Sequence, residues 1–312
     1  MRVLITGSTG FIGRSLGRFA ILSGHEVLGL SRAARPSVDW SGRYLHMDVA
    51  QTDLSPVVRD FAPHVIVHAA GTASVAASLE DPLKDFRTAI VTWINTLDSV
   101  RRAGIQPVVI FPSSAAVYGN PDLLPVREDC PMRPISPYGF HKVASEFLAQ
   151  EFAQCFGLDI LICRFFSVFG PAQRRGLIWE IYKQCVGPEP VVWLQGTGKE
   201  ARDFVHIDDL ASALFLLIEQ RLQAQHGSRC LTLNIASGEA TEVLPLADQL
   251  RDLIASTKSL QCHGLEREGD PDRWSADISL FTSLAPRWEP KPLALRLRQC
   301  VAAWQKEQDF LS

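Results

Sequence analysis

The feature that most constrains the fold is a glycine-rich turn near the start of the chain. It reads T-G-S-T-G-F-I-G at 6–13, follows a short apolar run and leads into a helix-patterned segment at 11–23. Gly7 permits a tight turn, Gly10 lets the backbone approach a pyrophosphate, and Gly13 lets the helix pack on the strand. The first N–H groups of such a helix have no partner within it and carry a partial positive charge. The turn therefore predicts a phosphate cradle at the end of the first strand.

Apolar runs alternate with helix-like segments through the first half of the chain. Most of these runs are continuous, as in V-I-V at 65–67, which is typical of strands buried on both faces of a parallel sheet. A glycine turn that binds nothing is therefore the weaker interpretation. The alternation predicts a doubly wound parallel α/β sheet, the Rossmann arrangement, with its ligand at the carboxyl ends of the strands. Strands are expected at 2–6, 26–31, 44–49, 64–70, 106–114 and 158–166, and helices at 11–23, 52–61, 82–103, 137–156 and 293–308.

The pattern changes after residue 166, where prolines and glycines become frequent. The apolar run 230–236 nevertheless predicts a strand that returns to the main sheet. We therefore expect a dinucleotide-binding domain and a smaller, discontinuous α/β substrate lobe. Their predicted bounds are 1–166 plus 204–236 for the first, and 167–203 plus 237–312 for the second.

The composition argues against several classes of function. The 31 basic and 34 acidic residues are scattered and give a net charge of −3, so no nucleic-acid surface is expected. The chain enters a strand within two residues and contains no long apolar run, so neither a signal peptide nor a membrane segment is expected. Seven dispersed cysteines without a C-x-x-C pair indicate reduced thiols in the cytoplasm rather than disulfides or a metal site.

The segment S-P-Y-G-F-H-K at 136–142 predicts the start of a catalytic helix. Ser136 is a good N-cap, and Pro137 suits the first helical position. Tyr138 and Lys142 are four residues apart and so share one helix face. Because an ammonium favours a nearby phenolate, Lys142 is expected to lower the pKa of Tyr138 from about 10 and make it an acid/base.

Two serines, Ser113 and Ser114, end the fifth expected strand. A hydroxyl at this place can hydrogen-bond the same oxygen that Tyr138 protonates or deprotonates; taken alone, the pair would be interpreted as a turn cap. His141, between Tyr138 and Lys142, is interpreted as a surface or packing residue.

Together these pieces resemble the extended short-chain dehydrogenase/reductase superfamily, and within it the NAD-dependent epimerase/dehydratase family. The glycines are spaced G-x-x-G-x-x-G, and the serine, tyrosine and lysine follow in the family's order. The resemblance implies an enzyme that transfers a hydride at C4 of a nucleotide-diphosphate sugar, as in UDP-galactose 4-epimerase-like enzymes. It covers essentially the whole chain and includes R-F-F-S-V-F-G-P at 164–171, G-T-G at 196–198, R-D-F-V-H-I-D-D at 202–209, N-I-A-S-G at 234–238 and G-D-P at 269–271.

The resemblance also implies roles for single residues. Tyr138 would be the acid/base, Lys142 would hold the nicotinamide ribose, and Ser114 would polarise the reacting oxygen. Substrate contacts are expected from Ser114, from Ser167 (where the family commonly has asparagine), and from two arginines that would grip the diphosphate, Arg202 and Arg267. Besides Tyr138 and Lys142, cofactor contacts are expected from Gly7, Thr9, Gly10, Phe11, Ile12, Ser31, Arg32, Asp48, Val49, Ala69, Ala70 and Gly71.

The end of the second expected strand bears on the choice of cofactor. NAD-binding chains usually place an acid there to accept from ribose hydroxyls, but this chain has Ser31 and Arg32 and no acid before Asp39. A serine and an arginine can bind a 2′-phosphate, so NADP is expected ahead of NAD. Because a reductase exchanges its cofactor at every turnover, this favours a 4-keto-sugar reductase. A 4-epimerase is the close alternative, and a non-catalytic dinucleotide-binding protein is the remote one.

Elimination of water is not expected from this chain. In 4,6-dehydratases that it resembles, the two residues after the active-site Ser or Thr supply the second acid or base. Here those residues are Ala115 and Ala116, which cannot exchange a proton.

The resemblance further implies a homodimer formed through the helix that carries Tyr138 and the helix before it. Phe147, Phe152 and Phe156 are expected to contribute the apolar surface of that interface, although packing against the protomer's own sheet explains part of the same stripe.

Overall fold

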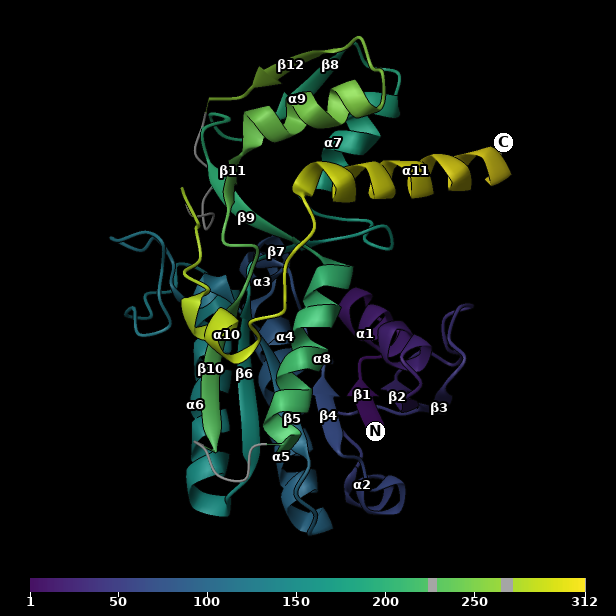
Figure 1. The fold of residues 1–312 in the computed structure, drawn as a ribbon, viewed down its shortest axis with the longest axis vertical. Helices are drawn as coiled ribbons and strands as arrows, with labels where there is room; N and C mark the ends of the chain where they lie inside the picture. The colour runs from purple at the N-terminus through teal and green to yellow at the C-terminus, as the bar shows by residue number, and fades with distance from the viewer. Residues whose placement is uncertain (224–228, 265–271, 312) are drawn as a thin grey trace.

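The computed structural model describes residues 1–223, 229–264 and 272–311 of the 312-residue chain. Its centre is a sheet of parallel strands (Figure 1). The chain runs outward from β1 to the edge, returns to β4 and then runs outward on the other side, so the predicted doubly wound sheet is confirmed. The sheet order is β10 (Cys230–Ile235), β6 (Asp159–Phe165), β5 (Val108–Ser114), β4 (Val65–His68), β1 (Arg2–Thr6), β2 (Glu26–Ser31) and β3 (Arg43–His46).

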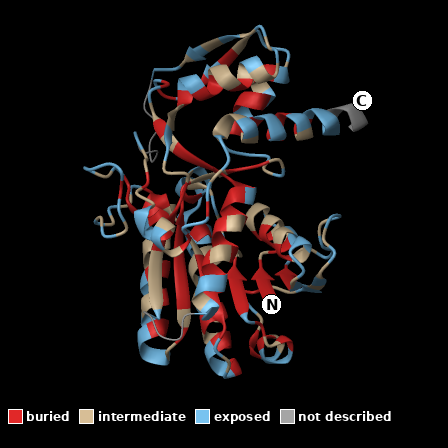
Figure 2. Cartoon of the chain, in the orientation of Figure 1, coloured by how far each residue is buried: buried red, intermediate tan, exposed pale blue. Residues whose placement is uncertain are grey.

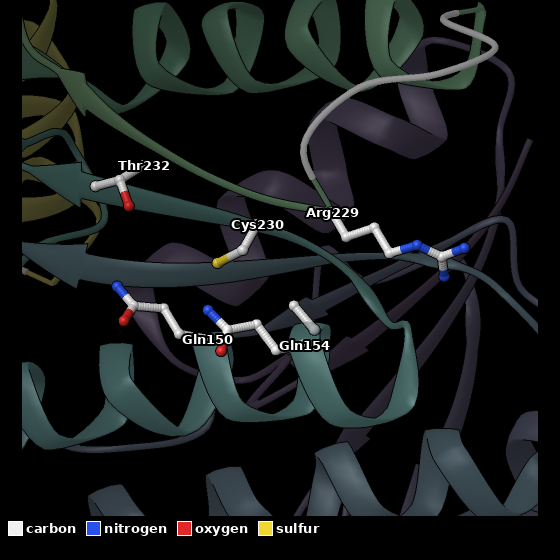
Figure 3. Close-up of a pocket in the computed structure, with 6 residues that line it drawn as sticks. Gln150, Gln154, Arg229, Cys230 and Thr232 are labelled. Atoms are coloured by element: carbon white, nitrogen blue, oxygen red, sulfur yellow. The ribbon is translucent and has the colours of Figure 1, made fainter.

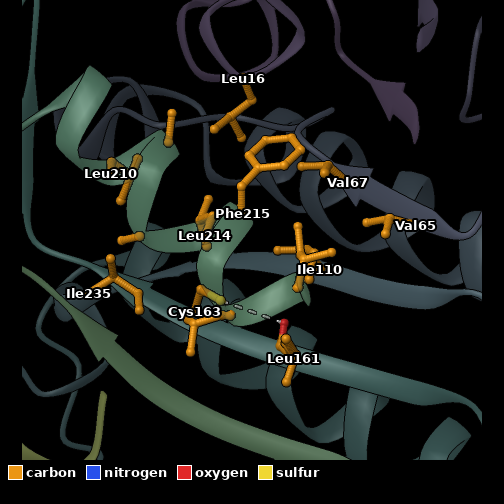
Figure 4. Close-up of a cluster of buried hydrophobic side chains, with 14 of the residues drawn as sticks. Leu16, Val65, Val67, Ile110, Leu161, Cys163, Leu210, Leu214, Phe215 and Ile235 are labelled. Carbon is orange, nitrogen blue, oxygen red and sulfur yellow. Dashed lines mark hydrogen bonds between the residues drawn. The ribbon is translucent and has the colours of Figure 1, made fainter. Parts of the chain in front are cut away.

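Helices cover both faces of this sheet, and successive residues of one strand face opposite sides. On β1, Val3 and Ile5 belong to one buried cluster, whereas Leu4 belongs to the other. Figure 4 shows part of the first cluster, and Figure 2 shows that the inner strands are almost entirely buried, whereas the edge strand β3 is largely exposed. The first cluster is completed by α1 (Phe11–Leu22), α8 (Ile207–Gln223) and α10 (Ser279–Leu284), and the second by α2 (Ser55–Phe61), α5 (Thr92–Ala103) and α6 (Pro137–Phe156).

The helix α6 has the predicted bounds, because strong signals mark both of its ends. Ser136 accepts a hydrogen bond from the backbone N–H of Gly139 at 3.2 Å, and Gly157 ends the helix in the left-handed conformation.

The helix expected at 82–103 is confirmed in its bounds. Asp81 adopts a non-helical conformation (φ −142°, ψ 82°) and caps a new start through the N–H of Lys84, while Pro82 has no N–H to continue a preceding helix. From Pro82 to Ala103 the helix runs without a break as α4 (Pro82–Phe86), a π-helical turn η1 (Arg87–Val91) and α5. The short α3 (Val75–Glu80) that precedes it was not expected.

The remaining elements form two small sheets and a separate apolar core, which includes Tyr182, Leu246 and Trp304. In Figure 1 they lie above the main sheet, and α11 extends away to one side. These elements are β7 (Ser167–Phe169), β9 (Ala201–His206) and β11 (Ala240–Glu242) in one sheet, β8 (Val191–Leu194) and β12 (Ser259–Cys262) in the other, and the helices α7 (Leu177–Val186), α9 (Val243–Leu253) and α11 (Leu293–Leu311).

No helix in the described part of the chain is both long enough and apolar enough to cross a membrane.

Candidate active site

The glycine turn has the geometry of a cradle for an anion. Gly7 has φ +67°, and a Cβ there would lie 2.5 Å from the carbonyl oxygen of Ala69. A Cβ on Gly13 would lie 2.4 Å from the carbonyl oxygen of Gly7, so side chains are excluded at both places. The helix α1 begins after Gly10 with no side-chain cap and no acidic residue in its first turn. Its first N–H groups are therefore left for a ligand, and the cradle fits a dinucleotide pyrophosphate.

Neighbouring strand ends are tied to this turn by hydrogen bonds. The hydroxyls of Thr9 and Ser31 lie 2.6 Å apart, which joins the ends of β1 and β2. The N–H of Ala70 donates to the Thr6 hydroxyl at 3.2 Å, which fixes the turn after β4. Ala69, Ala70 and the exposed Gly71 thus lie beside the glycine turn.

The other predicted cofactor residues lie around this group. Phe11 approaches Gly170, whose added Cβ would lie 3.4 Å from the Phe11 ring. Ile12 is partly buried against the core under α1. Asp48 accepts from the N–H of Ala50 at 2.9 Å, and Val49 is buried.

Arg32 lies on the rim of an open depression of about 440 Å³ between the end of β2 and α4. Three of its lining side chains are cationic and one is anionic, so the rim has a net positive charge. The lining residues are Arg32, Asp81, Leu83, Lys84, Arg87 and Thr88.

Ser114, Tyr138 and Lys142 meet at the carboxyl end of β5. The Ser114 hydroxyl hydrogen-bonds Tyr138, and the Lys142 Nζ lies 5.7 Å from the centroid of the Tyr138 ring. Lys142 also donates to the carbonyl of Pro112 at 2.6 Å, which holds the ammonium against the strand.

The pKa of Tyr138 shifts in the direction opposite to the expected one. Burial of its hydroxyl raises the pKa, and the charge of Asp85 raises it further. The groups that favour the phenolate are Ser114, through its hydrogen bond, and Arg175, through its charge. The expected lowering of the Tyr138 pKa by Lys142 is therefore wrong.

Lys142 is itself shifted. Burial lowers its pKa to about 8, and the carboxylates of Asp85 and Glu146 oppose that shift.

The sequence interpretation missed a buried carboxylate beside these groups. Asp85 on α4 is 3% exposed, accepts from the Thr72 hydroxyl and accepts from His141 Nδ1 at 2.5 Å. His141 is thus a partly buried hydrogen-bond partner that packs against Phe86, which agrees with the packing interpretation of it and not with the surface one. A histidine between Tyr138 and Lys142 was the one available signal.

The predicted substrate residues lie on the smaller sheets. Ser167 begins β7, and Arg202 on β9 places its guanidinium 5.6 Å from the centroid of the Trp274 ring. The neighbouring Asp203 is fully buried, and its carboxylate accepts from the backbone N–H groups of Ser237 and Gly238. Arg267 lies outside the described residues.

A second open depression, of about 470 Å³, lies between α6 and β10 (Figure 3). None of the predicted site residues lines it, so it is separate from the candidate site. Its lining residues are Gln150, Ala153, Gln154, Arg229, Cys230 and Thr232. Within the described ranges, no group of three or more His, Cys, Asp or Glu residues is arranged to hold a metal ion.

The geometry predicts that Tyr138→Phe lowers turnover by at least about 100-fold, the usual size of an acid/base contribution. Cofactor affinity should stay near the wild-type value, because the ring remains in place. Turnover by direct product analysis and affinity by fluorescence titration would be measured together. Tyr182→Phe, in the core of the smaller lobe, is the matched control. Wild-type turnover in Tyr138→Phe would refute the assignment.

Comparisons with known proteins agree with this geometry. A model of the NAD dependent epimerase/dehydratase family matches residues 3–236. The UDP-glucose 4-epimerase of Mycolicibacterium smegmatis is 32% identical over 303 residues, which cover 93% of this chain and 94% of that protein.

Two solved structures of similar proteins show which ligands and which activities occur with this fold. A UDP-glucose-4-epimerase from Stenotrophomonas maltophila, with bound NAD and formylated UDP-arabinopyranose, matches with a TM-score of 0.89 at 26% identity over 100% of both chains. TunA, an NAD-dependent NDP-hexosamine 5,6-dehydratase, matches with a TM-score of 0.86 at 26% identity over 98% of both chains. Because the family model spans most of its length, the chain belongs to the NAD-dependent epimerase/dehydratase family.

Proposed function

We propose that the protein is a nucleotide-sugar 4-epimerase that works with bound NAD. The observation that carries the proposal is the meeting of Ser114, Tyr138 and Lys142 beside the glycine cradle. Relatives named as UDP-glucose 4-epimerases, and similar structures solved with NAD, support an epimerase over the reductase that Ser31 and Arg32 favour.

In this proposal each residue of the group has one task. The bound dinucleotide would supply a hydride acceptor, and then donor, at its nicotinamide ring. Tyr138 would take the proton of the C4 hydroxyl and later return it to the same oxygen, which Ser114 would hold. Lys142 would bind the nicotinamide ribose. Because burial raises the pKa of Tyr138, the base would depend on Ser114, on Arg175 and on the positive charge of the oxidised nicotinamide.

The substrate side of the proposal is a nucleotide-diphosphate sugar held between two lobes. Arg202, stacked on Trp274, would grip the diphosphate together with Arg267, and Ser167 would contact the sugar. The division into a dinucleotide-binding domain (1–166 plus 204–236) and a substrate lobe (167–203 plus 237–312) is part of this proposal.

We further infer that the protein is not a 4,6-dehydratase. Ala115 and Ala116 follow Ser114, are buried and cannot exchange protons. TunA shows that the fold itself does not exclude elimination, so this inference depends on the two alanines alone. A purely non-catalytic role is disfavoured, because such a protein would have no need for the serine, tyrosine and lysine together.

The proposed function predicts interconversion of two C4 epimers. The purified protein would be incubated with UDP-glucose, UDP-N-acetylglucosamine or UDP-glucuronic acid, and the products separated by chromatography. We expect an equilibrium mixture of epimers, no net change in added NAD(H) and no 4-keto-6-deoxy product. Formation of that product, or no turnover of any nucleotide sugar, would refute the proposal.

The second candidate, an NADPH-dependent 4-keto-sugar reductase, is favoured by the positive rim beside β2. Arg32, Lys84 and Arg87 line the same depression, and no acidic side chain ends β2. Three cations around one depression suit a 2′-phosphate. Stoichiometric consumption of NADPH with a 4-keto-6-deoxy sugar nucleotide would support this candidate.

Arg32→Asp tests the cofactor argument. If Arg32 binds a 2′-phosphate, the substitution should weaken NADP(H) binding relative to NAD(H) by at least about tenfold, or ~1.4 kcal/mol. Arg35→Asp is the matched control, since Arg35 is also exposed and lies outside the depression. Titration of both variants with both cofactors would give the ratio. An unchanged ratio in Arg32→Asp would remove the support for NADP and for the reductase.

We infer that the protein forms a homodimer through α5 and α6. Phe147 and Phe156 are 56% and 45% exposed on α6, and Phe140 is 59% exposed, which leaves apolar surface for a partner copy. Phe152 is 5% exposed and packs in the protomer's own core, so it is not part of that surface. Sedimentation equilibrium at micromolar concentration should give twice the mass of the chain; a monomer would contradict the inference.

A cytoplasmic location is also proposed. All seven cysteines are free, including the exposed Cys155, which suits a reducing compartment.

A further inference from the structure

One side chain of α5 holds the turn that follows β3. The amide nitrogen of Asn95 donates to two backbone carbonyls, those of Val49 at 2.6 Å and Thr52 at 2.8 Å. An asparagine amide has two N–H donors, so these contacts use both of them. The turn is thus fixed to α5 by a single residue.

The hydrogen bonds within the turn converge on Asp48. Its carbonyl accepts from the backbone N–H groups of Gln51 at 3.1 Å and Thr52 at 3.0 Å, and its carboxylate accepts from the N–H of Ala50 at 2.9 Å. These bonds fold residues 48–52 into one compact turn, but none of them reaches another element. The hydrogen bonds that attach the turn to a helix come from Asn95.

The order of the strands places this turn at the outer end of the cofactor site. The glycine cradle follows β1, Ser31 ends β2, and β3 is the next strand beyond. At the end of β3, the N–H of Met47 donates to the carbonyl of Ser31 at 2.8 Å. In a dinucleotide-binding fold the pyrophosphate lies at the first turn, and the adenosine ribose lies near the end of the second strand. The base would therefore lie beyond the ribose, beside the turn 48–52.

The turn offers hydrogen-bond acceptors to such a base. The side chain of Asp48 is partly exposed, and bonds from Ala50 and Gln51 use two of the about four acceptor sites of its carboxylate. Adenine carries an exocyclic amino group, which is a donor. Hypoxanthine has a carbonyl oxygen at the same place, and that oxygen cannot donate. A correctly placed turn would therefore bind adenine in preference to hypoxanthine.

Two more residues on the same face of α5 fasten the segment that follows the turn. The buried Ser99 hydroxyl accepts from the N–H of Leu54 at 3.1 Å, and Arg102 pairs with Asp53. Asn95, Ser99 and Arg102 are four and three residues apart, which is the spacing of neighbours on one helix face. Because α5 leads from the carboxyl end of β4 to the amino end of β5, Asn95 lies nearest the cofactor edge of the sheet.

We propose that Asn95 is a positioning residue, which holds the turn 48–52 in the place where it recognises the adenine end of the cofactor. Its amide bonds the backbone of the turn, and the turn in its place would bond the base. The inference rests on the proposed function in one respect, because the dinucleotide is taken to be NAD(H).

The test compares the binding of NADH with that of its deamino analogue, in which hypoxanthine replaces adenine. Both contain the fluorescent reduced nicotinamide, so both dissociation constants come from the same titration, without a sugar substrate. The wild-type protein should bind NADH more tightly. In Asn95→Ala the turn loses both bonds to α5, and this preference should fall at least about threefold, the size of one lost hydrogen bond. Asn95→Asp has nearly the same shape but no donor, so it should act in the same direction.

Ser99→Ala is the matched control, because it separates positioning from stability. It removes a hydrogen bond to the same segment, one helical turn farther from the cofactor edge. It should lower the melting temperature but leave the preference for NADH at its wild-type value. Melting temperatures would be recorded for every variant, since a loss of stability alone would weaken the binding of both dinucleotides equally.

Four outcomes would overturn the proposal. The first is equal binding of the two dinucleotides by the wild-type protein, and the second is an unchanged preference in Asn95→Ala and Asn95→Asp. The third is an equal loss of preference in Ser99→Ala. The fourth is failure of both variants at position 95 to fold, which would assign Asn95 to stability alone. Failure of the proposed function would instead appear as no turnover of any nucleotide sugar, with the two dinucleotides still discriminated.

Discussion

The site depends on a buried ion pair behind it, between Glu146 on α6 and Arg164 on β6. Both side chains are almost inaccessible, and the guanidinium contacts both carboxylate oxygens. The remaining hydrogen-bonding capacity is also used, because Ser113 donates to Glu146 at 2.5 Å and Arg164 donates to Tyr118 at 2.8 Å. Such a pair stabilises the charged state only when its partners are satisfied, and here they are. Although burial disfavours it, the hydrogen bonds and charge of Glu146 raise the pKa of Arg164.

This pair, with the hydrogen bond from Ser113, holds α6 and its Tyr138 against β5, which ends in Ser114. Ser113 precedes Ser114 on the strand, and Glu146 lies one helical turn after Lys142. When Glu146 is held by β6, α6 cannot rotate without breaking a buried charge pair, which typically costs about 3–5 kcal/mol. The hydrogen bond between Ser114 and Tyr138 therefore depends on residues that touch neither cofactor nor substrate.

The sequence predicts those features of the fold that are determined by residues close together along the chain. The bounds of α6 follow from Ser136, Pro137 and Gly157, and the sheet follows from continuous apolar runs. The glycine cradle, likewise, is a local pattern. By contrast, β9 was not predicted, because Ala201–His206 is short and polar at its start and pairs with strands that lie far away in sequence.

The same limit explains why the electrostatics of the site were not foreseen. His141 and Asp85 are 56 residues apart, so the sequence cannot show that they meet. The Tyr138–Lys142 spacing predicts a helix face but not the desolvation that raises one pKa and lowers the other. Burial depends on the whole fold. Its effect on the two pKa values is larger than that of the attraction between Tyr138 and Lys142, which is all that the four-residue spacing predicts.

The substrate side is coupled to the catalytic side through one aromatic side chain. Trp274 donates to the carbonyl of Gly119 at 3.1 Å, in the turn that follows Ser114, and its ring lies under the guanidinium of Arg202. Gly119 has φ +62°, and a Cβ there would lie 2.0 Å from the carbonyl oxygen of Arg133, so this turn has little freedom to move. Trp274 thereby connects the proposed diphosphate-binding residue Arg202 to the turn that follows Ser114. Because a misplacement of about 1 Å can cost a reaction about 100-fold in rate, a fixed connection of this kind would let binding of the distant diphosphate orient the sugar in the proposed reaction.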